Sequence, residues 1–204
     1  MKLFLVRHGE TESNRLGLAL GRADVPLNER GRWQAQRLAA ALAAAPLAAV
    51  YSSPLSRALD TARPIAGEHG LQVQVDEGLT EMDIGEAEGL TFVEVRSRFP
   101  GLLEAWVGAG GPNQAMPGGE RLVDVQARAW QTVQAIAAGH AEEAACAVTH
   151  NFVILSILTT VLGIDLANFR RLRHSVGAIS VLEFRPQRVR VLKLNDTCHL
   201  ETEG

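Results

Sequence analysis

The stretch "MKLFLVRHGETESN" (residues 1–14) carries the pattern on which the fold depends. Its unbroken apolar run, KLFLV (2–6), is typical of a strand that is covered on both faces. Arg7, His8 and Gly9 follow directly where this run ends. Packing alone gives no strong reason to place a guanidinium, an imidazole and a glycine there, so the stretch indicates chemistry at the end of a buried strand.

Further strands and helices alternate along the chain. Additional strands are expected at LAAVYSS (47–53), LQVQV (71–75) and AACAVTH (144–150). Helices are expected over 29–45 after Asn28, from Pro54 to Glu68, over 122–136, and over 151–162 with Gly163 as the stop. AISVLEF (178–184) and VRVLKLN (189–195) are joined by only four residues, so they should pair as a hairpin.

This alternation predicts an α/β fold, a three-layer α/β/α sandwich whose mostly parallel sheet has an antiparallel edge strand. The length of 204 residues suits a single domain spanning 1–204. Residues 76–120 are irregular, with short helices expected near 91–98 and 101–107. We expect this range to form a lid.

Composition excludes several classes of protein. A formal net charge of −3 gives no electrostatic case for nucleic acid or an anionic membrane, although a local arginine pocket for a small anion remains compatible with it. No apolar run is long enough for a transmembrane helix or a signal peptide, so a cytoplasmic location is expected. The two cysteines, Cys146 and Cys198, have neither metal-ligand spacing nor a disulfide framework.

Polar residues follow three of the expected strands. Arg7-His8-Gly9, Ser52-Ser53 and Thr149-His150-Asn151 each stand at a strand's carboxyl end, where ligands gather in open α/β sheets. An arginine can bind two phosphoryl oxygens and a neutral imidazole can attack phosphorus. Arg57 would lie in the first turn of a helix starting at Pro54, and its alternative interpretation is a surface arginine. His150 precedes a helix start, which favours either an anion partner or a residue beside the helix cap.

Five motifs in series resemble those of one family. They are LVRHGET with Asn14, SSPLSRALDTA, LTEMDIGEAEGLT, MPGGE and VTHNFVI. Their order and types are similar to the histidine phosphatase superfamily, which includes cofactor-dependent phosphoglycerate mutases and fructose-2,6-bisphosphatase. The resemblance spans about residues 3–199 and implies a phosphoglycerate mutase-like fold.

The resemblance also implies a role for each matching residue. His8 matches the nucleophile that becomes phosphohistidine. Arg7, Arg57 and His150 match the groups around the phosphoryl oxygens, and Asn14 matches a further contact. Phosphoryl transfer depends on in-line placement and charge stabilisation, which two guanidiniums and a second imidazole supply without a metal or a cofactor.

Glu81 matches the carboxylate that protonates the leaving alcohol, a role that requires a pKa above its ordinary value. Asp83 and Glu86 lie nearby in the sequence and are alternative candidates for this acid. Asn151 and Gly21 are further candidates for substrate contact. His199, in a segment that resembles the family's C-terminal part, either supports the structure or approaches the site.

The phosphatase branch of the family is favoured over the mutases. EMDIGEAEGLT follows Glu81 in place of the stretch typical of mutases, and residues 99–120 hold no arginine for a substrate carboxylate. The expected function is metal-independent hydrolysis of a small-molecule phosphate ester. The alternatives are a cofactor-dependent mutase, a non-catalytic phosphate-binding module and a metal-dependent phosphatase.

Ala87 and Asn151 depart from residues common in the family, which leaves the substrate open. The oligomeric state is open too, with a homodimer as one option.

Overall fold

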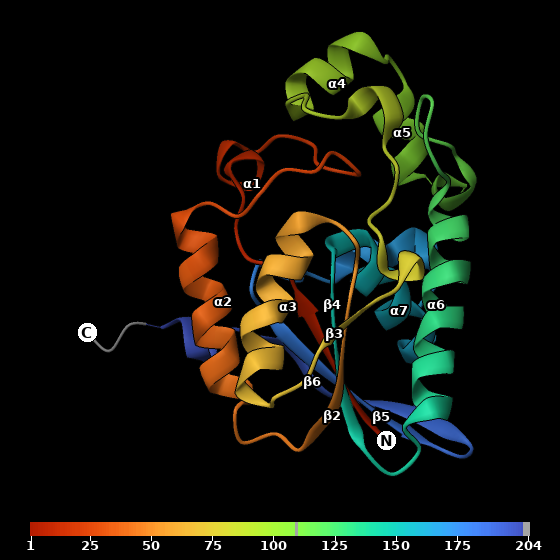
Figure 1. The fold of residues 1–204 in the computed structure, drawn as a ribbon. Coiled ribbons are helices and arrows are strands. Elements are labelled where there is room, and N and C mark those ends of the chain that lie inside the picture. The colour runs from red at the N-terminus through yellow and green to blue at the C-terminus, as the bar shows by residue number, and fades with distance from the viewer. Residues whose placement is uncertain (109, 202–204) are drawn as a thin grey trace.

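Six strands form one sheet in the computed structural model, which describes residues 1–108 and 110–201. In chain order they are β1 (Lys2–Arg7), β2 (Leu47–Ser52), β3 (Val73–Val75), β4 (Ala144–Thr149), β5 (Ile179–Arg185) and β6 (Arg188–Asp196). Their order across the sheet is β3-β2-β4-β1-β5-β6, in which the first four strands are parallel. β5 pairs antiparallel with both β1 and β6, so the expected hairpin and antiparallel edge are confirmed (Figure 1).

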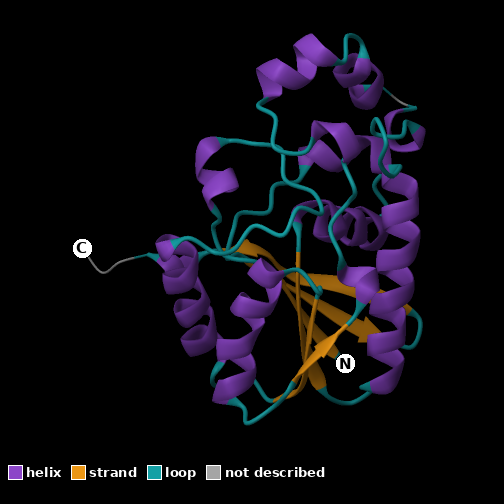
Figure 2. Ribbon diagram, turned by 45° about the horizontal axis from the view of Figure 1, so that its top comes forward, coloured by secondary structure: helices purple, strands orange, loops and turns teal. Residues whose placement is uncertain are grey.

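Helices cover both faces of this sheet. α2 (Glu29–Leu42) and α3 (Ser56–Glu68) lie on one face, and α6 (Leu122–Gly139) and α7 (Asn151–Leu162) lie on the other (Figures 1 and 2). The side chains of β1 alternate accordingly: Val6 belongs to the apolar cluster with α2 and α3, whereas Leu3 and Leu5 belong to the cluster with α6 and α7. The three-layer sandwich is therefore confirmed.

The ends of the helices follow local chemistry. Asn28 caps α2 as predicted, because its side chain accepts a hydrogen bond from the Gly31 amide at 2.8 Å. The prediction that α3 begins at Pro54 is wrong: the helix begins at Ser56. Ser53 Oγ accepts the Leu55 amide at 3.3 Å, and Leu55 keeps an extended backbone (ψ 136°). Arg57 still lies in the first turn.

Beyond the carboxyl ends of the parallel strands lie three short helices, α1 (Glu12–Leu16), α4 (Phe92–Arg98) and α5 (Leu102–Val107) (Figure 1). The range expected to form a lid divides into two parts. Leu79, Met82, Ile84 and Ala87 are buried in the core, whereas α4 and α5 extend away from the sheet. Across the described ranges, no helix is long and apolar enough to cross a membrane.

Gly31 makes a backbone approach that no other residue fits. A Cβ atom there would lie 2.0 Å from the Glu10 carbonyl oxygen, whereas a Cβ at Gly67 in α3 would meet no atom within 4 Å. Gly31→Ala should lower the free energy of unfolding by about 1–3 kcal/mol through overpacking. Gly67→Ala should raise it by about 0.5–1 kcal/mol, because alanine suits a helix better than glycine. Urea denaturation measures both, and a loss of stability no larger at Gly31 than at Gly67 would contradict this account.

Candidate active site

The parallel strands bring the predicted residues to one edge of the sheet. Arg7 is the last residue of β1 and pairs in register with Thr149 of β4, so His8 and His150 are the next residue of each strand. The centroids of these two imidazole rings lie 5.0 Å apart. The residues that the sequence placed at separate strand ends are therefore neighbours.

His8 is held as a neutral imidazole with one defined tautomer. The ring is 3% exposed, and its Nδ1 lies 2.7 Å from the Gly9 carbonyl oxygen. A carbonyl can only accept, so Nδ1 carries the hydrogen and Nε2 keeps its lone pair. Burial, followed by the charges of Arg57 and Arg7, lowers the His8 pKa well below 6.5. The neutral form is the nucleophilic one.

His150 is the N-cap residue of α7 and is fully buried. Its Nε2 lies 2.7 Å from Ser53 Oγ, in the loop after β2. Its Nδ1 is buried without a hydrogen-bond partner among the described residues. Burial and the neighbouring His8 lower its pKa well below 6.5 as well. A buried ring nitrogen without a partner is costly unless a ligand supplies one.

Arg7 and Arg57 are held mainly by backbone carbonyl oxygens. Arg57 is fully buried and donates to the carbonyls of Ala23 at 2.7 Å and Gly21 at 2.6 Å. Arg7 Nη1 donates to the His174 carbonyl and to Asn151 Oδ1. The Nε atoms of both arginines are buried and lack partners within the described part of the chain. Burial lowers the pKa of Arg7 to about 10, so the group remains a cation at neutral pH.

Glu81 is 3% exposed and lies in the segment after β3. Its carboxylate accepts the amides of Met82 at 2.9 Å and Phe152 at 3.2 Å. Burial raises the pKa of Glu81 above 4.5, even though these amides and the charges of Arg7 and Arg57 act in the opposite direction. Glu81 is therefore a buried carboxyl whose pKa is raised, which is the direction that a proton donor requires.

Three residues that sequence reasoning missed fix the backbone around Glu81. Arg128 of α6 donates to the carbonyls of Gly78, Thr80 and Glu81, and it also pairs with Glu120. Glu120 in turn accepts the Asp83 amide and pairs with Arg22. One signal was present: Arg128 lies three residues after Val125 and four before Thr132, both buried. A charge on the apolar face of a helix indicates a buried partner.

The remaining candidates lie at the edge of the same site. Asn14 and Asn151 line a cleft of about 560 Å³ together with Arg7, Arg170 and Arg173. Gly21 has both backbone groups engaged by protein, because its amide donates to Glu88 and its carbonyl accepts Arg57.

Two other candidates from the sequence lie outside this group. Glu86 is exposed and pairs with Arg98. His199 Nε2 lies 2.9 Å from the Gly177 carbonyl oxygen. The Gly177 amide donates in turn to the Arg7 and His8 carbonyls. The segment of Gly177 and His199 therefore stabilises the backbone at the end of β1.

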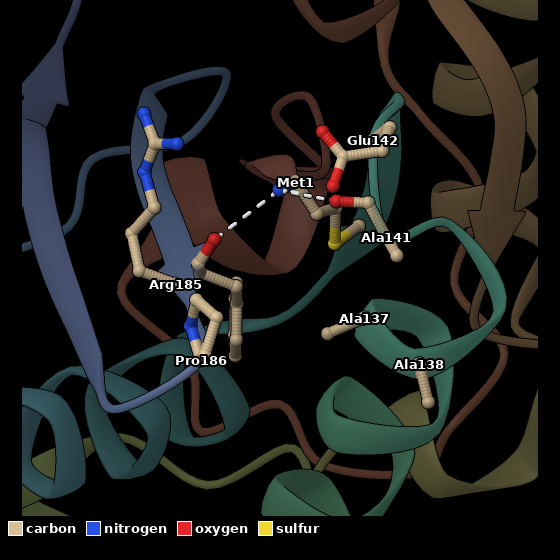
Figure 3. A pocket seen from close by; sticks show the side chains of 8 residues that line it. Met1, Ala137, Ala138, Ala141, Glu142, Arg185 and Pro186 are labelled. Atoms are coloured by element: carbon tan, nitrogen blue, oxygen red, sulfur yellow. Dashed lines mark hydrogen bonds between the residues drawn. The ribbon is translucent and has the colours of Figure 1, made fainter.

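A separate cavity of about 310 Å³ lies at the opposite end of the sheet. It is lined by Met1, Ala137, Arg185 and Pro186 among others, and the amino group of Met1 donates to the Ala141 carbonyl beside it (Figure 3). None of the predicted site residues lines it. Within the described residues, no cluster of three or more His, Cys, Asp or Glu side chains could hold a metal ion.

His174 makes stability depend on pH. It is 1% exposed, its Nε2 lies 2.9 Å from Ser180 Oγ, and burial lowers its pKa from 6.5 to about 3. Below pH 6.5 the His174 ring binds a proton in the unfolded chain but stays neutral in the folded protein. The free energy of unfolding therefore decreases as pH falls towards 3. When the pH is lowered from 5.5 to 4.5, the free energy of unfolding should decrease in both proteins. The decrease should be about 1.4 kcal/mol smaller in His174→Gln than in the wild type. Equal losses in urea titrations at the two pH values would refute this assignment.

Comparison with known proteins agrees with this geometry. The model of the histidine phosphatase superfamily (branch 1) matches residues 3–197. Phosphoserine phosphatase 1 of Hydrogenobacter thermophilus is 34% identical over 201 residues, covering 98% of this chain and 94% of its own.

Two solved structures extend the likeness to the fold. YhfR of Bacillus stearothermophilus superposes with a TM-score of 0.91 at 33% identity, covering 98% of this chain and 99% of its own. A phosphoserine phosphatase of Entamoeba histolytica in complex with phosphoserine has a TM-score of 0.87 at 28% identity, covering 98% and 99%. The chain belongs to branch 1 of the histidine phosphatase superfamily.

Proposed function

We propose that this protein hydrolyses small phosphate monoesters through a phosphohistidine at His8, without a metal ion. Its relatives include phosphatases named for phosphoserine and for glucosyl-3-phosphoglycerate, and the chain is a phosphoric monoester hydrolase that acts on small phosphorylated metabolites. What the proposal adds is the nucleophile, the acid and the source of the stabilising charge.

One observation carries the proposal. Arg7 Nε, Arg57 Nε and His150 Nδ1 are all buried without partners, and all three belong to residues around the neutral His8 ring. Buried polar atoms in folded proteins are nearly always satisfied, so two unpaired guanidinium N–H donors beside an unpaired imidazole nitrogen support a missing anion. A phosphoryl group has oxygens for all three, and two guanidiniums stabilise its charge in the transition state.

The reaction proceeds in two displacements. His8 Nε2 attacks phosphorus, an N–P bond forms, and the P–O bond to the alcohol breaks. The departing oxygen takes the proton of Glu81, and the alcohol leaves. The Glu81 carboxylate then accepts a proton from water as the water oxygen attacks phosphorus, the N–P bond breaks, and phosphate leaves. His8 regains its lone pair and Glu81 its proton.

We also propose that residues 91–108, with α4 and α5, form the lid that sequence analysis expected over 76–120. This part extends from the sheet beyond the strand ends where the site lies (Figure 1). Residues 76–90 belong instead to the part that holds Glu81, and Glu120 belongs with them because it accepts the Asp83 amide.

His8→Ala should reduce turnover of p-nitrophenyl phosphate on the order of a thousandfold or more, because the nucleophile is lost. Rapid quenching at alkaline pH and mass spectrometry should find an acid-labile phosphoryl group on His8 in the wild type only. His69→Ala is the matched control, because His69 lies at the far end of α3 and contacts the Leu42 carbonyl. Near-normal turnover by His8→Ala, or a phosphoryl group on another residue, would rule out this nucleophile. Activity of the wild type should persist in chelator.

Glu81→Gln should reduce kcat/KM far more for butyl phosphate than for p-nitrophenyl phosphate, because only the alkoxide needs a proton to leave. Glu86→Gln, a change at an exposed carboxylate in the same segment, should alter neither rate by more than about twofold. Steady-state kinetics on both esters provide the test. Equal losses on the two esters would show that Glu81 is not the acid, and a selective loss in Glu86→Gln would transfer the role to Glu86.

A further inference from the structure

An apolar pocket of about 420 Å³ shares Arg170 with the cleft of about 560 Å³ that Arg7, Asn14 and Asn151 line. Its apolar lining comes from five parts of the chain: the loop after α1, the turn that contains Ala87, α4 and α5, the loop before α6, and α7. Leu18, Val95, Leu103, Trp106, Met116 and Phe152 are the main side chains. Three charged residues, Arg96, Glu104 and Arg170, also line it, and all three are exposed. The interior of the pocket is therefore apolar and its charges lie at the solvent edge.

The pocket adjoins the site on the side of the proposed acid. The Phe152 amide donates to Glu81 Oε2 at 3.2 Å, while the Phe152 side chain lines the pocket. The rings of Trp106, Phe152 and Phe169 pack edge to face, with centroids 5.3–6.0 Å apart. Phe169 lines the cleft of about 560 Å³ that also contains Arg7, so these rings form a wall shared by that cleft and the pocket. Arg170 lines both.

The lid exposes large apolar side chains at the mouth of this pocket. Phe92 is 59% exposed and Val107 is 47% exposed, and both belong to the lining. Exposed apolar surface around a concave site marks a place where a ligand is bound. A charged group drawn into this interior would lose its hydration without a partner, whereas an alkyl or aromatic group would gain by leaving water.

We infer that the preferred ester carries an alkyl or aromatic body in its leaving alcohol, and that this body occupies the apolar pocket. The inference rests on the proposed function, because Glu81 marks the leaving-group side only if it is the acid. It separates this chain from a phosphatase that selects a small zwitterionic alcohol such as serine.

Binding of n-alkylphosphonates tests the pocket without any turnover. Their C–P bond is not hydrolysed and the charged group stays constant from ethyl to hexyl, so only burial of the chain changes. Titration calorimetry should give dissociation constants that fall roughly fourfold per methylene. The kcat/KM values of the matching n-alkyl phosphates should rise in parallel, since the pKa of the leaving alcohol is nearly the same throughout the series.

Two matched variants locate the effect. Val107→Asp places a charge in the lining and should weaken hexylphosphonate binding at least tenfold more than ethylphosphonate binding. Val93→Asp makes the same change on α4 at a side chain that is 75% exposed and outside the pocket, and it should leave the series unchanged.

The possible outcomes separate the two proposals. Hydrolysis without chain-length dependence, or tighter binding of phosphoserine than of hexylphosphonate, would overturn the inference and leave the phosphatase intact. Chain-length-dependent binding without hydrolysis of any ester would overturn the proposed function while showing that the pocket binds apolar groups. An effect of Val93→Asp equal to that of Val107→Asp would also overturn the assignment of the pocket.

Discussion

The site depends on two guanidiniums, Arg57 fully buried and Arg7 partly buried, to which no carboxylate of the described residues is bonded. Burying an unpaired cation is costly, and proteins usually offset this cost with an ion pair. Here carbonyl dipoles replace the ion pair: Gly21 and Ala23 accept from Arg57, and His174 accepts from Arg7. Carbonyls satisfy the donors without cancelling the positive charge. The field of both cations therefore stays available to a phosphoryl group. Burial, the larger cause, and this field together lower the pKa of the neighbouring imidazoles.

Carbonyl oxygens can hold the two guanidiniums only if the loops that carry these carbonyls are fixed. This requirement explains several charged residues that do not themselves lie around the His8 ring. The Glu88 carboxylate accepts the amides of Gly21 and Ala23, whose carbonyls hold Arg57. Asp24 accepts the Ser56 amide at the start of α3, which fixes the helix that carries Arg57. Arg128 and Glu120 do the same for the segment of Glu81. Each of these charges acts on backbone groups, so its effect on the reaction is one of positioning.

The sequence predicts the side chains at strand ends better than it predicts the side chains that hold distant backbone groups. Apolar periodicity predicts the sheet and its helices, and the ends of strands place Arg7, His8 and His150 together before any resemblance is considered. The resemblance was needed to single out Glu81, since a glutamate in a loop has no local mark of burial. Arg128, Glu88 and the late start of α3 were not predicted, because their partners are amides and carbonyls of distant segments. Any residue supplies those groups, so they leave no pattern in the sequence.

The residues around His8 and the proposed lid have different roles in the site. The phosphoryl group is the same in every ester, so in the proposed reaction the contacts of Arg7, Arg57 and His150 lower the barrier without distinguishing one substrate from another. Discrimination must then come from the alcohol, and half of the residues that line the pocket inferred to receive it belong to α4 and α5. Phe152 connects the two parts, because its amide holds Glu81 and its ring faces the lid. Changes of sequence in the lid can therefore redirect the enzyme to another ester while the chemistry at His8 stays as it is.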